Sequence, residues 1–376
     1  GLISARDLAP AAYMAASTAV SAGFLSNLFH GSFCYDPFLS DATLEFNNRV
    51  RDEDTVLEVP DGDAAEVAHC LTTDGGNPVR RRGLEVTGEL AWIQSKLTDR
   101  IQWAKLDGLM RSLIAAGEHE RAFVLRELSS PLAGKWLHAV PQDDLTSFED
   151  DDMRVLLRVQ LLIDVGVPGE ECPYCDEPMD TLGSHAKRCT RANDTVARHD
   201  SMRNHIEALL REAKMAGVEV GPRGLIVGED RRPDVAWRES GTTKSIDLTY
   251  CGAPLANDFV NGEMRGAVGV RELGEDESWD DFLGPMAGER GEDRKWNHYR
   301  DIRLDVGVDR VRPFGIGVYG ALGPEANKIC RMILKKIRAK HHRREHWTVN
   351  AEFWQKISII IKKTLASAIR LRHQRP

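Results

Sequence analysis

Four side chains that bind soft metal ions lie within one short stretch of the sequence. Cys172 and Cys175, then His185 and Cys189, follow the pattern C-x2-C-x9-H-x3-C. Tetrahedral Zn²⁺ takes four nitrogen or sulfur ligands, and a closed Cys3His set keeps no open position for a substrate. The spacing therefore predicts a structural zinc site, in which His199 is an alternative ligand to His185.

Two carboxylates come shortly afterwards, each within a strand-like apolar pattern. Asp234 follows Pro233, and Asp247 lies thirteen residues further on. On paired antiparallel strands around a turn, the two side chains can converge on one ion. Mg²⁺ prefers carboxylate oxygens, and when bound it polarises a phosphoryl oxygen and acidifies a water molecule. The alternative is that both aspartates are ordinary solvated turn residues.

The surrounding pattern predicts the elements that position these residues. Apolar residues at helical spacing predict helices before residue 165 over 1–30, 91–116, 121–128, 132–137 and 153–163. Beyond the zinc ligands we expect strands over 217–220, 225–227, 233–237, 245–250 and 311–319. Helices are expected over 196–216, 256–271, 294–304, 324–340 and 347–371. The predicted fold class is α+β and multidomain, with an all-helical N-terminal part and an α/β core.

The composition is that of an ordinary globular chain. The 376 residues are 42% hydrophobic, and the seven cysteines show no paired framework, which favours a reducing compartment. No run of about eighteen apolar residues exists, so no membrane span is expected. The sequence begins at Gly1 rather than Met, which suggests a piece of a longer protein.

The charge is unevenly distributed. Residues 328–376 contain 14 Lys or Arg and 2 Asp or Glu, although the whole chain has a net charge of −8. A basic tail on an acidic body indicates contact with a polyanion such as nucleic acid, while a solvated helix face or an anionic membrane surface are the alternatives. The candidate nucleic-acid-binding residues of this tail are Lys335, Lys336, Lys340, Arg343, Arg344, Lys362 and Lys363.

The stretch Cys172–Tyr250 resembles the C-terminal region of non-LTR retrotransposon proteins. In that family a CCHC zinc knuckle precedes a restriction-enzyme-like endonuclease of the PD-(D/E)xK superfamily. The resemblance rests on the four zinc ligands, on Arg231-Arg-Pro-Asp-Val235 and Asp247-Leu-Thr249, and on Lys295-x-x-x-Tyr299. It implies a Mg²⁺-dependent nuclease in which Asp234 and Asp247 bind the metal and Lys295 assists.

The resemblance also implies a domain order and partners. It predicts a helical linker over 1–165, a knuckle over 166–194, an endonuclease core over 195–325 and a basic helical tail over 326–376. A reverse transcriptase domain of the same polyprotein would precede Gly1. The partners would be target DNA and the element RNA, the location nuclear, and the product a nick whose 3′ hydroxyl primes reverse transcription.

The sequence departs from the superfamily pattern at two positions. Thr249 stands where the second acid is usually followed by Lys, so Lys295, or the weaker candidate Lys244, would supply the cation. Gly221 stands where the family often has another acid, a place that Glu219 could fill. These departures favour two rival hypotheses: a catalytically decayed nucleic-acid-binding module, and a zinc-stabilised structural partner of the polymerase.

Overall fold

The computed structural model describes most of the chain from residue 101 to residue 373. The gaps are residues 142, 145, 167–169, 193, 229, 253–272, 274–277 and 342–343. Before residue 101 it describes residues 42, 44, 45 and 48, strands β1 (Thr73–Asp74) and β2 (Asn77–Pro78), and helix α5 (Thr87–Ala115). The chain forms two compact units, Gly1–Ser112 and Leu113–Pro376, and the following description concerns the second.

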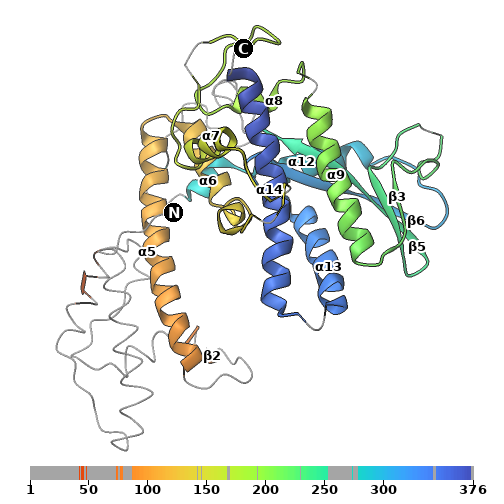
Figure 1. The fold of residues 1–376 in the computed structure, drawn as a ribbon, viewed down its shortest axis with the longest axis horizontal. Helices are drawn as coiled ribbons and strands as arrows, with labels where there is room; N and C mark the ends of the chain where they lie inside the picture. The colour runs from red at the N-terminus through yellow and green to blue at the C-terminus, as the bar shows by residue number, and fades with distance from the viewer. Residues whose placement is uncertain are drawn as a thin grey trace, which may run out of the picture. The chain divides into compact units, whose positions relative to one another are not determined.

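In its described residues the second unit combines helices with one mixed four-stranded sheet, which makes it an α+β structure (Figure 1). Its helices are α6 (His119–Leu128), the 3₁₀ helix η3 (Lys135–His138), α7 (Asp150–Gln160), α8 (Ser184–Arg188), α9 (Asp194–Glu212), α11 (Trp279–Leu283), α12 (Ala287–Tyr299), α13 (Pro324–Lys340) and α14 (His346–His373). Its strands are β3 (Ala216–Val220), β4 (Val235–Glu239), β5 (Thr242–Cys251) and β6 (Val308–Gly317).

The sheet has the order β3-β4-β5-β6, and its central hairpin is β4–β5. Ser240 and Gly241 connect these two strands and both have positive φ angles, 51° and 82°, as a two-residue hairpin of type I′ requires. The antiparallel register pairs Val235 with Ile246. One step further along, this register sets Asp234 opposite Asp247. Strand β6 then adds parallel to β5 after a crossover that contains α12.

One face of the sheet carries the main hydrophobic core. The buried side chains of β4, β5 and β6 on this face include Trp237, Ile246 and Phe314, each 0% exposed. They pack with the apolar sides of α9, α13 and α14, which lie side by side (Figure 1). Because side chains alternate along a strand, Asp247, between Ile246 and Leu248, belongs to the opposite face.

Helix α12 covers that opposite face at very short range. A Cβ atom on Gly291 would lie 2.5 Å from Cys251 Sγ, and a Cβ atom on Gly315 would lie 2.0 Å from the carbonyl oxygen of Gly288. Only glycine fits at such contacts, so these residues let the helix rest directly on β5 and β6. Lys295 and Tyr299 follow Gly291 at intervals of four residues and therefore share its side of the helix.

Most of the predicted elements of the second unit are present, with shifted ends. The strand predicted over 225–227 is wrong: the segment forms turns and a single isolated bridge between Ile226 and Leu304. The helices predicted over 1–30 and 256–271 lie outside the described residues. None of the helices in the described part of the chain combines the length and the apolar character that crossing a bilayer requires.

The position of Lys362 contradicts one prediction for the basic tail. Its side chain is 1% exposed inside the structure, where Nζ donates a hydrogen bond to the Tyr319 carbonyl oxygen at 2.9 Å. The assignment of Lys362 to nucleic-acid binding is therefore wrong. Burial lowers the pKa of Lys362 to about 7, against the opposing effect of the buried Glu127 carboxyl of α6.

The burial of Lys362 predicts how the stability of the protein depends on pH. Because the folded-state pKa lies below the unfolded value, the unfolded chain binds the extra proton between pH 7 and pH 10, and stability rises with pH. We expect the unfolding free energy of the wild type to gain about 1.4 kcal/mol per pH unit over this range relative to Lys362→Met. Urea denaturation of both proteins at several pH values measures the difference. Equal pH slopes would contradict the assigned pKa.

Candidate zinc cluster and carboxylate site

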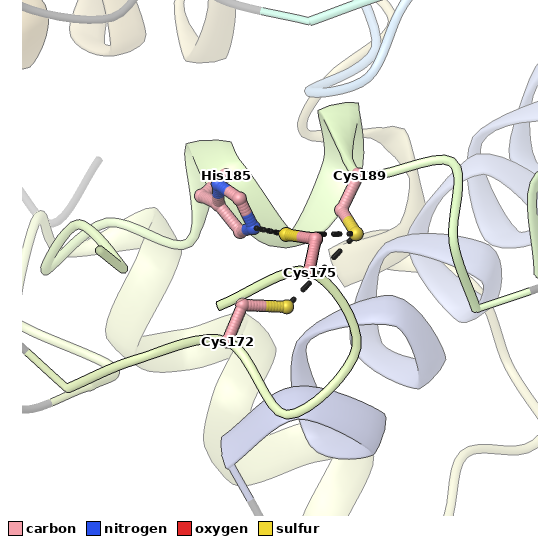
Figure 2. A group of neighbouring side chains, drawn as sticks. All are labelled: Cys172, Cys175, His185 and Cys189. Carbon is pink, nitrogen blue, oxygen red and sulfur yellow. Dashed lines mark hydrogen bonds between the residues drawn. The ribbon is translucent and has the colours of Figure 1, made fainter. Parts of the chain in front are cut away.

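The four predicted zinc ligands converge in the structure. Cys172 and Cys175 come from a tight loop, and His185 and Cys189 lie within and directly after α8 (Figure 2). Their ligand atoms all lie within 4.8 Å of one another. Cys175 Sγ is 3.3 Å from His185 Nε2 and 3.7 Å from Cys189 Sγ, which is 3.9 Å from Cys172 Sγ.

These separations suit a tetrahedral ion. With zinc bonds of about 2.0–2.3 Å, neighbouring ligand atoms lie about 3.5–3.8 Å apart. Three thiols and one imidazole are also a donor set that zinc prefers over magnesium or calcium. Cys172, His185 and Cys189 are at most 8% exposed, so water has little access to the cluster. The cluster is therefore able to hold a metal such as zinc in a structural role.

Two further residues stabilise the segment that carries the cluster, and one of them connects it to the rest of the second unit. Asp180 accepts hydrogen bonds from the backbone amides of Ser184 at 2.7 Å and of His185, which fixes the start of α8. Arg372 of α14, 2% exposed, donates to the Cys189 carbonyl oxygen at 3.0 Å and to Asp194 at 2.8 Å. The last helix of the chain is thus bonded directly to the metal-ligand segment.

The second site is built around Asp234 and Asp247. Asp234 immediately precedes β4, and its backbone amide donates to the Ile246 carbonyl oxygen at 2.9 Å, which continues the β4–β5 ladder. Asp247 lies in β5 and is 6% exposed. The antiparallel register sets the two residues opposite each other, and each carboxyl group shifts the pKa of the other. The predicted convergence of the two carboxylates on neighbouring strands is therefore present.

Donors from two helices and the backbone hold one oxygen of each carboxylate. Asp234 Oδ2 accepts from the Leu248 amide at 2.6 Å and lies 3.1 Å from His199 Nε2 of α9. Asp247 Oδ2 accepts from Lys295 Nζ at 2.6 Å and from the Tyr299 hydroxyl, both of α12. Two acids and one lysine, from a loop, a strand and a helix, thus meet at one point.

The surroundings shift the pKa values of the two carboxyl groups in opposite directions. Burial, together with the adjoining Asp234, raises the pKa of Asp247 to about 6, although Lys295 lowers it. Burial also acts to raise the pKa of Asp234, but hydrogen bonds from His199 and the Leu248 amide bring it below its usual value. The hydrogen bond to Asp234 in turn raises the pKa of His199. A divalent cation would relieve the repulsion between the two carboxylates.

The other predicted participants lie elsewhere. Glu219 is exposed on β3, and no described interaction connects it with the two aspartates. Gly221 donates its amide to the Asp234 carbonyl oxygen at 2.9 Å, and a Cβ atom there would meet nothing within 4 Å. Lys244 pairs with Asp309 at 2.5 Å. It is three residues from Asp247 in the same strand, and an odd spacing directs the two side chains to opposite faces.

The predicted tail residues are mostly engaged within the chain. Their described partners are the Glu239 carboxylate for Lys336 at 2.9 Å, the Glu212 carbonyl for Lys340 at 3.2 Å, Glu352 for Arg344 and the Asp144 carbonyl for Lys363. Lys335 is exposed on α13, and Arg343 lies outside the described residues. Contact of these residues with nucleic acid stays a prediction.

Sequence reasoning missed two roles at these sites. The sequence predicts His199 as an alternative zinc ligand, whereas in the structure His199 contacts Asp234; its position five residues after Asp194, in the first turns of α9, gives no sign of this. The hydrogen bonds of Asp180 to the start of α8 could have been suspected from its spacing of four residues to Ser184.

The chain was compared with known proteins, and neither a family model nor a curated sequence matches it.

Proposed function

We propose that the chain contains a metal-dependent DNA endonuclease of the restriction-enzyme-like type. The observation that carries this proposal is the meeting of Asp234, Asp247 and Lys295 from three separate elements on one face of a mixed sheet, at its central strands. Thr249, at the usual position of the lysine, packs beneath Gly291 of α12 instead. The helix that takes this space also carries Lys295 to the acid pair, which accounts for the displaced lysine.

The chemistry of the proposed site follows from its donors. Mg²⁺, when bound by the two carboxylates, would supply Lewis-acid activation of a phosphodiester and of a water molecule. Lys295 places an ammonium group beside Asp247, where it can stabilise charge that develops on a phosphate oxygen. Tyr299 and His199 hold the carboxylates in fixed orientations.

The broader setting follows from the resemblance to non-LTR retrotransposon proteins. In that setting the zinc cluster is a structural knuckle, and the nuclease nicks target DNA in the nucleus to prime reverse transcription. Element RNA and the reverse transcriptase domain of the same polyprotein would be further partners. The predicted boundaries at residues 165, 194 and 325 belong to the same proposal.

The direct test is nicking of supercoiled plasmid by the zinc-loaded protein with Mg²⁺ or Mn²⁺. We expect open-circular product that depends on the added cation. A protein that binds DNA but yields no nicked product would favour the decayed binding module instead. Gly221 is the observation that favours this second candidate, because the residue facing Asp234 across the strand pair carries no carboxylate.

His199 gives a sharper prediction for the same reaction. We expect His199→Ala to lower both the nicking rate and the apparent Mn²⁺ affinity by about 10–100-fold, the usual effect of losing a group that orients a metal ligand. His199→Gln, which keeps a donor near Asp234, should recover part of both. His341→Gln removes a histidine that pairs with Glu212 instead and should change neither. Unaltered Mn²⁺ affinity in His199→Ala would refute the orienting role.

A further inference from the structure

The two faces of the sheet separate the basic tail from the carboxylates. Helices α13 and α14 pack on the face of Trp237, Ile246 and Phe314. Asp247 and α12 occupy the other face, where Gly291 touches Thr249 and Cys251. The sheet therefore stands between the exposed cations of α13 and the proposed reaction centre. A phosphate at Asp247 must be reached from the side of α12.

Two irregular segments flank the carboxylates on that side and are bonded to each other. The loop between β3 and β4 runs along the segment after α12: the Val227 amide donates to the Arg303 carbonyl oxygen at 2.9 Å, and the Asp305 amide donates to the Leu225 carbonyl oxygen at 3.1 Å. Ile226 and Leu304 form a bridge between them. The two segments are thus held together next to the acid pair. Asp234 stands at the end of the β3–β4 loop, and Tyr299 directly precedes the segment after α12.

The exposed residues of these two segments include five arginines. We call them the arginine rim: Arg223, Arg231, Arg232, Arg300 and Arg303. Arg231 Nη1 lies 3.2 Å from His298 Nε2, and the His298 ring packs edge-on against that of Tyr299 at 5.0 Å. Arg232 is two residues before Asp234, and Arg300 directly follows Tyr299. The rim therefore lies beside the acid pair on both segments.

Exposed carboxylates in the same segments limit the net positive charge. Asp230, Asp301 and Asp305 are exposed there, and Asp305 accepts the Val306 amide at 2.8 Å. With Glu229 of the same loop counted from the sequence, five arginines stand against four acidic residues, which leaves a small positive excess. Guanidinium groups also present paired donors that match phosphate oxygens. Such contacts fix the register of a duplex without reading its sequence.

We propose that the arginine rim, rather than the basic tail, binds the phosphates of duplex DNA that flank the bond to be cut. This inference rests on the proposed nuclease for the choice of DNA as the partner. The rim would position the strand over Asp234 and Asp247 from the α12 side. The exposed cations of α13 form the alternative surface for DNA binding.

The test measures duplex binding without cleavage. Each protein carries Asp247→Asn and is titrated against a fluorescent 30-base-pair duplex in Mg²⁺ at several salt concentrations, with anisotropy as the readout. The rim variant is Arg231→Gln, Arg232→Gln, Arg300→Gln. The matched variant of the alternative surface is Lys328→Gln, Arg331→Gln, Lys335→Gln on α13, which removes the same charge. Thermal melts verify that both variants fold.

We expect the rim variant to lose at least tenfold in affinity and to reduce the slope of log Kd against log salt by about 2–3, as loss of three phosphate contacts predicts. The α13 variant should change affinity less than twofold. A loss confined to the α13 variant, equal losses in both, or no duplex binding by the parent protein would overturn the proposal.

The nuclease assay separates the two proposals. Plasmid nicking by the wild type together with unchanged binding of the rim variant refutes the rim while the nuclease stands. Weakened binding of the rim variant without any nicking by the wild type supports the rim and refutes the nuclease.

Discussion

Asp247→Asn is expected to reduce metal-dependent nicking by more than about 100-fold. Loss of a group that only orients a metal ligand already causes a 10–100-fold effect, and Asp247 is a proposed ligand itself. The amide is nearly the same size as the carboxyl group and can still accept from Lys295 and Tyr299, so the local geometry should survive. What the substitution removes is the negative charge that a divalent cation requires.

The fold is not expected to weaken in this variant, because the change removes one of two adjoining buried negative charges. Thermal unfolding and duplex binding should therefore stay near wild-type values while nicking disappears. Asp309→Asn is the matched control, since Asp309 pairs with Lys244 away from the site. Nicking by Asp247→Asn at the wild-type rate would show that cleavage takes place elsewhere in the protein.

Loss of the zinc ligands is expected to destabilise the whole second unit. Removing a structural metal ranks among the mutations that cost more than about 4 kcal/mol. For a unit of this size each kcal/mol corresponds to about 2–4 °C, so Cys172→Ser should lower the melting temperature by about 8–16 °C. The effect should spread because Arg372 of α14 bonds to the Cys189 carbonyl, and the Gly183 backbone lies against Ile369.

The measurement combines metal analysis, thermal unfolding and hydrogen exchange. The wild type should contain one zinc per chain, and a chelator should lower its melting temperature but leave Cys172→Ser unchanged. Amide protection should fall in α14 (His346–His373) as well as around the cluster. Loss of protection confined to residues 172–189 would instead show a knuckle that folds independently of the core.

The Cys3His cluster and the strand pair that carries the two acids could both be predicted from the sequence alone. Both depend on short-range order: C-x2-C and H-x3-C spacing place ligands within one loop and one helical turn. Likewise, two apolar runs around Ser240-Gly241 suffice to predict a hairpin whose register opposes Asp234 and Asp247. The strand predicted over 225–227 failed because its apolar residues bridge a neighbouring loop at Ile226 alone.

Which distant side chains join these sites depends on how the helices pack on the sheet. Lys295 is 48 residues from Asp247, and its arrival depends on Gly288 and Gly291, which let α12 approach the sheet closely. His199 reaches Asp234 because α9 packs on the hydrophobic core to which β4 and β5 also contribute. Lys362, basic in the sequence, is buried because α14 turns that side toward Tyr319. Charge and spacing describe one element at a time, whereas the packing of helices on the two faces of the sheet determines which charges meet.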